Sequence, residues 1–200
     1  LNISPSTVSR ALRNHPDISS RTKEQVISLA KELDYHPNSI AQSLQKRSTN
    51  TIGVIVPEIK YHFFSSVISG IEDVAYEFGY IIMVCQSNES YERENINVRT
   101  LVSNRIAGLL ISISQTTKND EHFRILQRQG IPFVFFDRVC KNIETSKVVV
   151  DDHDGAFRAV EHLILSGYKR IAHLAGPRSI SISQDRFQGY LSALKKYNIP

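Results

Sequence analysis

The sequence predicts an α/β fold in which a doubly wound parallel sheet follows a small all-α segment at the N-terminus. Two observations indicate this division. Up to about residue 50, apolar residues recur at intervals of three and four, as in amphipathic helices. From Thr51 onward, short apolar runs alternate with helical segments. Such alternation forms right-handed βαβ units around a parallel sheet that helices cover on both faces.

The first helix is predicted to begin at Pro5. Ser4 precedes it as a favoured N-cap, and proline suits the first helical position. Apolar residues then share one face up to Leu12. The proline within residues 14–17 disfavours helical geometry in the residue before it, so the helix ends there.

A second helix is predicted to begin at an N-cap, Ser19 or Ser20, and to end at residues 34–37. Its apolar stripe consists of Val26, Leu29, Ala30 and Leu33. A third helical segment at residues 38–44 is too short to be stable alone. We therefore interpret residues 38–50 as a hinge.

The remaining elements are predicted to alternate along the chain. The strands are expected at residues 52–57, 80–85, 107–113, 133–136, 147–151 and 170–175. The helices are expected at about 65–78, 91–104, 119–129, 155–166 and 184–197. Ligands of open parallel sheets bind beyond the carboxyl ends of the strands, so these ends are the candidate site.

The composition indicates a soluble globular protein. Apolar residues make up 41% of the chain, and the longest apolar run is the six residues from Tyr80 to Cys85, too short for a membrane helix. No signal-peptide pattern follows Leu1. The two cysteines, Cys85 and Cys140, form no CxxC pair, which fits a reducing compartment. We expect a cytoplasmic location.

The positive charge is concentrated at the N-terminus. Residues 1–50 carry seven Lys and Arg against four acids, whereas residues 51–200 carry 17 against 16. A basic N-terminal segment on a nearly neutral body indicates a polyanionic partner.

No catalytic constellation is visible in the sequence. GxSxG and GxxxxGK[ST] motifs are absent, and no two histidines have HxxxH spacing. The acids within residues 151–154 are typical of a helix N-terminus that caps itself, rather than of a metal site. We therefore expect no enzymatic activity, no cofactor and no metal.

Residues 4–12, Ser-Pro-Ser-Thr-Val-Ser-Arg-Ala-Leu, closely resemble the recognition helix of LacI/GalR-type bacterial transcription repressors. The resemblance continues in the family's order at residues 30–38, 41–44, 51–57, 63–64, 70–72, 108–110, 130–132, 161–163, 176–177 and 186–190. Two departures concern the ends. We expect most of the family's first helix-turn-helix helix to precede Leu1, and a long stretch completing the second lobe to follow Pro200.

The resemblance implies a domain organisation. A partial helix-turn-helix headpiece would occupy residues 1–37 and a hinge helix residues 38–50. The periplasmic-binding-protein-like body would then comprise an N-subdomain at 51–140 and the start of a C-subdomain at 141–200.

The predicted DNA contacts of the headpiece lie in the first turns of the recognition helix, which enters the major groove. Ser6 can donate to or accept from a base edge, Thr7 and Ser9 suit phosphate oxygens, and Arg10 can bind guanine or phosphate. Pro5 offers only apolar contact. The alternative is that these residues are merely a capped helix start.

In the hinge, the resemblance implies a helix that folds on DNA and enters the minor groove. Leu44 would be the apolar wedge between base pairs, and Lys46 would meet a phosphate. Asn38 and Ala41 complete the hinge pattern and are predicted DNA contacts. The alternative is that Leu44 only packs on the body.

The predicted effector site combines aromatic, acidic and basic side chains, which together suit a polyhydroxylated ligand such as a sugar. By resemblance, Phe63, Phe64, Asp154 and Arg186 fall on effector-pocket positions, and Ser112 ends a strand beside them. The alternatives are core packing for the two phenylalanines and, for Arg186, an ion pair with an acid such as Asp185 or Asp154. The apolar Ile180 and Ile182 leave the effector's identity open.

These inferences predict a DNA-binding transcriptional regulator, expected to be a repressor, whose operator affinity a small effector controls. It would act as a homodimer on a pseudo-palindromic operator, because a two-fold protein matches a two-fold site. The alternatives are a periplasmic-type sugar-binding protein without a DNA role and a doubly wound enzyme using residues 151–154.

Overall fold

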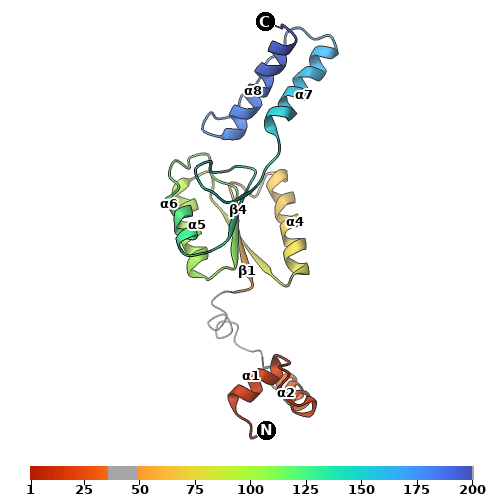
Figure 1. Ribbon diagram of the computed structural model, residues 1–200, viewed down its shortest axis with the longest axis vertical. Helices are drawn as coiled ribbons and strands as arrows, with labels where there is room; N and C mark the ends of the chain where they lie inside the picture. Colours follow the sequence, from red (N-terminus) through yellow and green to blue (C-terminus); the bar gives the residue numbers. More distant parts are fainter. Residues whose placement is uncertain (36–48, 200) are drawn as a thin grey trace. The chain divides into compact units, whose positions relative to one another are not determined.

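The computed structural model describes residues 1–35 and 49–199. The chain divides into two compact units, Leu1–Lys46 and Arg47–Pro200 (Figure 1). Four residues predicted to contact DNA from the hinge lie outside the described residues: Asn38, Ala41, Leu44 and Lys46.

The first unit contains the two predicted N-terminal helices, α1 (Pro5–Leu12) and α2 (Ser20–Glu32). Both start as the sequence predicts. The Ser4 side chain accepts a hydrogen bond from the Thr7 N–H, and the Ser19 side chain accepts one from the Thr22 N–H. Ala11 of α1 and Val26 of α2 are buried.

The second unit is built on a five-stranded parallel sheet in the order β2-β1-β3-β4-β5. The strands are β1 (Thr51–Val56), β2 (Ile81–Gln86), β3 (Gly108–Ile111), β4 (Phe133–Phe136) and β5 (Ser146–Val148). The chain leaves β1 toward β2 and then crosses back to β3, so the order reverses beside β1. Such a reversal opens a crevice at the carboxyl ends of the strands.

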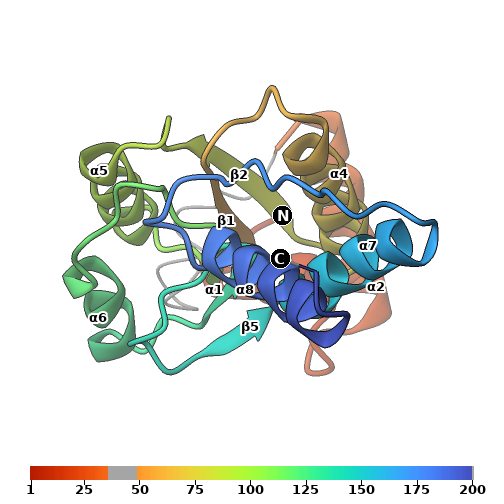
Figure 2. The ribbon, with the colours of Figure 1, turned by 90° about the horizontal axis from the view of Figure 1, so that it is seen from above.

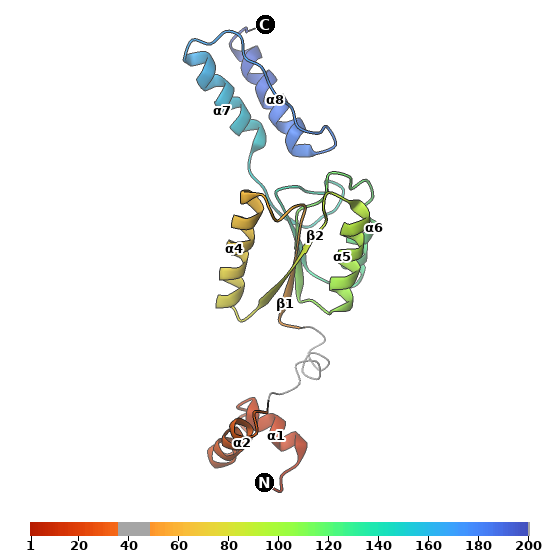
Figure 3. The same cartoon turned by 180° about the vertical axis from the view of Figure 1, so that it is seen from behind.

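Helices cover both faces of this sheet, which confirms the doubly wound fold. Helix α4 (His62–Glu77) lies on one face, and α5 (Tyr91–Ser103) and α6 (Glu121–Arg128) lie on the other (Figures 1 and 3). Alternate residues of β1 supply the two cores, because successive strand side chains point to opposite faces. Val54 and Val56 pack with Phe64, while Ile55 packs with Phe123.

Beyond β5, α7 (Asp152–Leu165) and α8 (Ser181–Lys196) run side by side (Figures 1 and 2). Val160, Ala193 and Leu194 are buried in a small core of their own. Because β5 pairs with β4, the predicted subdomain boundary after residue 140 falls between two strands of one sheet.

The strand predicted at residues 170–175 is wrong. These residues have no regular secondary structure, and Leu174 is 98% exposed. An apolar run becomes a strand only when a neighbouring strand satisfies its backbone groups, and no described strand pairs with this one.

Among residues 1–35 and 49–199, no helix combines the length and apolarity that crossing a membrane requires.

Candidate functional site

A cleft of about 670 Å³ opens beyond the carboxyl ends of the strands. Apolar side chains make up most of its wall, and Asp137, Arg138, Asp152, Ser183 and Arg186 supply polar groups. A small polar set in an apolar cavity of this size is typical of a small-molecule site.

Three of the five predicted effector residues line this cleft: Phe63, Phe64 and Arg186. The two phenylalanines differ in burial, because Phe63 is 53% exposed and Phe64 only 4% exposed. Their rings meet edge to face with centroids 5.1 Å apart. Phe64 therefore belongs to the core beside the cleft, whereas the ring of Phe63 is half-exposed and lines the cleft.

Ser112 is fully buried behind the cleft and does not line it. Its hydroxyl donates to Asp137 Oδ2 at 3.3 Å. Burial raises the pKa of the Asp137 carboxyl, and the neighbouring Arg138 and the Ser112 hydroxyl oppose that rise. Ser112 is therefore connected to the cleft only through its hydrogen bond to Asp137, which lines the cleft.

Arg186 is paired with Asp152, since its Nε lies 2.7 Å from Asp152 Oδ1. Asp154 lies outside the cleft and pairs with Arg158 at 2.7 Å. The reason is helical geometry. Asp151 caps α7 by accepting from the Asp154 N–H, so Asp152 and Asp154 stand about 200° apart around the helix.

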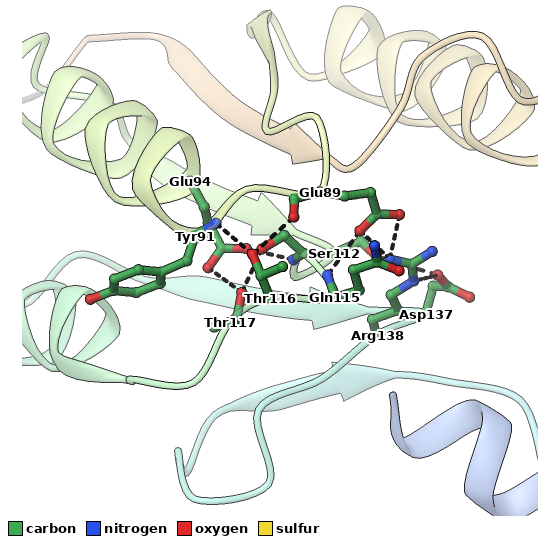
Figure 4. A network of polar contacts seen from close by, with 10 residues as sticks. Glu89, Tyr91, Glu94, Ser112, Gln115, Thr116, Thr117, Asp137 and Arg138 are labelled. Carbon is green, nitrogen blue, oxygen red and sulfur yellow. Dashed lines mark hydrogen bonds and ion pairs between the residues drawn. The ribbon is translucent and has the colours of Figure 1, made fainter. Parts of the chain in front are cut away.

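A buried carboxylate organises the loop that follows β3 (Figure 4). Glu94 of α5 has no exposed surface and accepts hydrogen bonds from the Ser114 N–H at 2.6 Å and the Thr117 hydroxyl at 2.8 Å. His122 Nε2 lies 2.8 Å from the same carboxylate. Because a carboxylate only accepts, we assign a proton to His122 Nε2, which donates to Glu94, while Nδ1 has no partner among the described residues.

A second carboxylate, Glu89, connects this loop to the end of β4 (Figure 4). Arg138 donates from Nη1 to both oxygens of Glu89 at 2.8 Å. Glu89 also accepts the Gln115 N–H at 2.8 Å, and its carbonyl accepts the Thr116 hydroxyl at 2.9 Å. Carboxylates from the β2–α5 region therefore hold the loop after β3 and the turn after β4, and Asp137 and Arg138 of that turn line the cleft.

In the first unit, α1 presents the predicted DNA contacts. Pro5, Ser6 and Arg10 are exposed, while Thr7 and Ser9 are half-buried. Pro5, Ser6, Ser9 and Arg10 fall within an arc of about 140°, on the side away from buried Ala11. Arg10 makes no ion pair with any described residue.

Comparisons with known proteins agree with this division of the chain. Residues 2–38 match the lacI family of bacterial regulatory proteins, and residues 49–199 match periplasmic binding proteins and the sugar binding domain of the LacI family. The chain belongs to the LacI family.

LacI-family relatives match nearly the whole chain. It is 32% identical to the transcriptional regulator GalR of Escherichia coli K12, covering 98% of this chain and 57% of that protein. It is also 32% identical to the repressor PurR of Vibrio vulnificus, covering 98% and 59%. The chain therefore spans less than two thirds of the length of these relatives.

Two solved LacI-family structures are also similar. A lac repressor dimer bound to operator and the anti-inducer ONPF matches with a TM-score of 0.84 and 27% identity, over 99% of this chain and 60% of that chain. A LacI-type protein of Alkaliphilus metalliredigens, complexed with D-xylulofuranose, matches at 0.66 and 29% identity, over 76% and 55%.

Three other charged residues line the cleft, Asp137, Arg138 and Asp152. Asp137 and Arg138 directly follow β4, and the sequence already indicates them by their place at a strand's carboxyl end. For Asp152, the signal is its position directly after the Asp151 N-cap, which places it on the opposite side of α7 from Asp154. No sequence signal indicates that Glu94 is buried, because a single acid in a helix is ordinarily exposed.

Within the described ranges, no three His, Cys, Asp or Glu side chains gather as a metal site.

We predict that Glu94→Gln destabilises the protein by about 3–5 kcal/mol. The amide places a donor where the carboxylate accepts three hydrogen bonds, leaving buried donors unsatisfied. Urea unfolding followed by circular dichroism measures the change. Glu92→Gln, on the exposed side of α5, is the matched control and is expected to leave the midpoint nearly unchanged. Equal midpoints for both variants would contradict the organising role of Glu94.

Proposed function

We propose that this protein is a transcriptional repressor that acts in the cytoplasm, binds an operator through α1 and responds to a sugar bound in the cleft. The observation that supports this proposal is that two features occur in the same chain. Arg10 and its neighbours form an exposed polar face on a capped helix, and a ligand-sized cleft lies in the second unit. A periplasmic sugar-binding protein would use the cleft but has no use for α1. An enzyme would need reacting groups that we do not find among the described residues.

Arg10 is the strongest candidate for base reading. Its side chain is exposed in the last turn of α1, and no described acid competes for it. The fixed fork of donors matches the O6 and N7 acceptors of guanine in the major groove. Pro5, Ser6, Thr7 and Ser9 complete this contact face. The hinge contacts of Asn38, Ala41, Leu44 and Lys46 stay predictions.

We predict that Arg10→Ala weakens operator binding by about 1–3 kcal/mol and relaxes preference at one base pair in each half-site. Fluorescence anisotropy with the operator and its single-base variants measures both effects. Lys31→Ala, at the exposed end of α2, removes the same charge and should leave base preference intact. A uniform loss over all DNA sequences for Arg10→Ala would instead make Arg10 a phosphate contact.

An exposed apolar surface supports a homodimer. Val74, Tyr76 and Phe78 near the end of α4 and Ile81 and Met83 of the edge strand β2 are 38–78% exposed. Exposed apolar patches mark interaction sites. The similar lac repressor structure is described as a dimer on operator. We infer that β2 and the end of α4 meet a second copy of the chain.

We predict that Ile81→Asp weakens dimerisation by about 2–4 kcal/mol, because it buries an unpaired charge in the interface. Analytical ultracentrifugation over a concentration series measures the dissociation constant. Leu165→Asp on α7 is the control, since Leu165 is 70% exposed and Ile81 68%. Unchanged dissociation for Ile81→Asp would exclude this face as the interface.

Arg186 is the residue through which we expect the effector to be sensed. It lines the cleft, and its pairing with Asp152 through Nε leaves the terminal guanidinium nitrogens available for ligand hydroxyls. Ile180, Ile182 and the exposed ring of Phe63 supply apolar contacts. Together they favour a sugar stacked on Phe63 with hydroxyls near Arg186. Asp154 is a weaker candidate because of its position outside the cleft.

We predict that Arg186→Lys lowers affinity for the effector by about 1.5–3 kcal/mol while operator binding persists, because an ammonium does not reproduce the planar fork. A thermal-shift screen of neutral sugars first identifies the effector. Calorimetry with that sugar then compares the variant with Arg158→Lys, whose ion pair lies outside the cleft. Unchanged affinity in Arg186→Lys would leave Arg186 with a purely structural role.

A further inference from the structure

A second cavity of about 500 Å³ lies beside the cleft. Its walls come from the loop after β3, the loop after β4 and the start of α8. Arg138 and Ile180 line both cavities, so the two sites are neighbours. The predicted effector residues do not line this second cavity.

The charge of this second cavity is positive. Lys118 and Lys141 line it, and neither makes a hydrogen bond or an ion pair with any described residue. Among the described residues that line it, Asp120 is the one acid, and Arg124 binds both of its carboxylate oxygens at 2.9–3.0 Å. The cations therefore exceed the available negative charge.

The polar groups around these lysines are donors of hydrogen bonds. Hydroxyl and amide side chains that donate to no described residue line the same cavity: Asn119, Asn142, Ser179 and Ser181. Hydroxyl and amide donors beside ammonium groups are suited to the oxygens of an anion.

The walls are held before any ligand arrives. Buried Glu94 accepts the Ser114 N–H and the Thr117 hydroxyl and so holds this wall in place, while Glu89 fixes Arg138, which keeps a donor for a ligand. The hydrogen bonds of Arg138 to Glu89 use only Nη1, which leaves Nη2 for another acceptor. Preorganised donors lose little conformational entropy on binding.

We propose that this second cavity binds the phosphate group of a small phosphomonoester, at a site separate from the effector cleft. Two unpaired lysines match the double negative charge of a phosphate better than the single charge of a carboxylate, and Nη2 of Arg138 adds a donor. The volume exceeds that of phosphate alone and leaves room for the esterified carbon chain. The inference depends on the cavity and not on the proposed regulation of DNA binding.

The test is isothermal titration calorimetry of the protein with glycerol 3-phosphate, inorganic phosphate and glycerol. We expect glycerol 3-phosphate to bind and glycerol not to bind. Lys118→Gln and Lys141→Gln should each weaken the binding of glycerol 3-phosphate at least tenfold. Lys169→Gln is the matched control, because Lys169 is exposed in a loop that lines neither cavity.

Each outcome decides the proposal. Equal affinity for glycerol 3-phosphate in Lys118→Gln, Lys141→Gln and Lys169→Gln overturns it, as does equal binding of glycerol. Binding of inorganic phosphate that both cavity variants weaken supports the phosphate contact. The assay contains neither operator nor sugar, so its failure is distinguishable from a failure of the proposed function, which the Arg10 and Arg186 variants test.

Discussion

Buried Glu94 is the constraint on which the site depends. A carboxylate without exposed surface is tolerated only if donors surround it. Here the donors come from the loop after β3 and from His122 of α6, whereas Glu94 itself belongs to α5. Satisfying one charge therefore fixes two helices and a loop at the carboxyl end of the sheet, where both cavities form.

The Glu89–Arg138 ion pair connects the loop after β2 to the turn after β4. Asn88 and Glu89, just after β2, and Asp137, just after β4, all have a positive φ of 52–58°. Such left-handed backbone is unfavourable for residues other than glycine and persists where the surroundings enforce it. The pair between Glu89 and Arg138 joins these two turns, with side chains only about a fifth exposed. Strain and ion pair together direct Asp137 and Arg138 toward the cleft.

Most of the fold was predictable because local patterns and tertiary packing agree. The capping serines, the apolar run of β1 and the alternation of strands and helices each indicate the observed element. The prediction failed at residues 170–175, where an apolar pattern has no partner strand among the described residues. For the site, residue types indicated aromatic and charged groups. The choice between Asp152 and Asp154 required the exact start of α7, which composition does not give.

Arg138 gives a physical route by which the two cavities influence each other. Its guanidinium lines both, and Glu89 already engages Nη1, so the remaining donors are shared. A phosphate that draws Nη2 toward the second cavity changes the charge facing Asp137, whose carboxyl lies 3.9 Å from Arg138 Nε. Asp137 is already easier to protonate because burial raises its pKa. Coupling free energies are reciprocal, so if a bound phosphate changes the affinity of the cleft for a sugar by this route, the sugar must change phosphate affinity by the same factor.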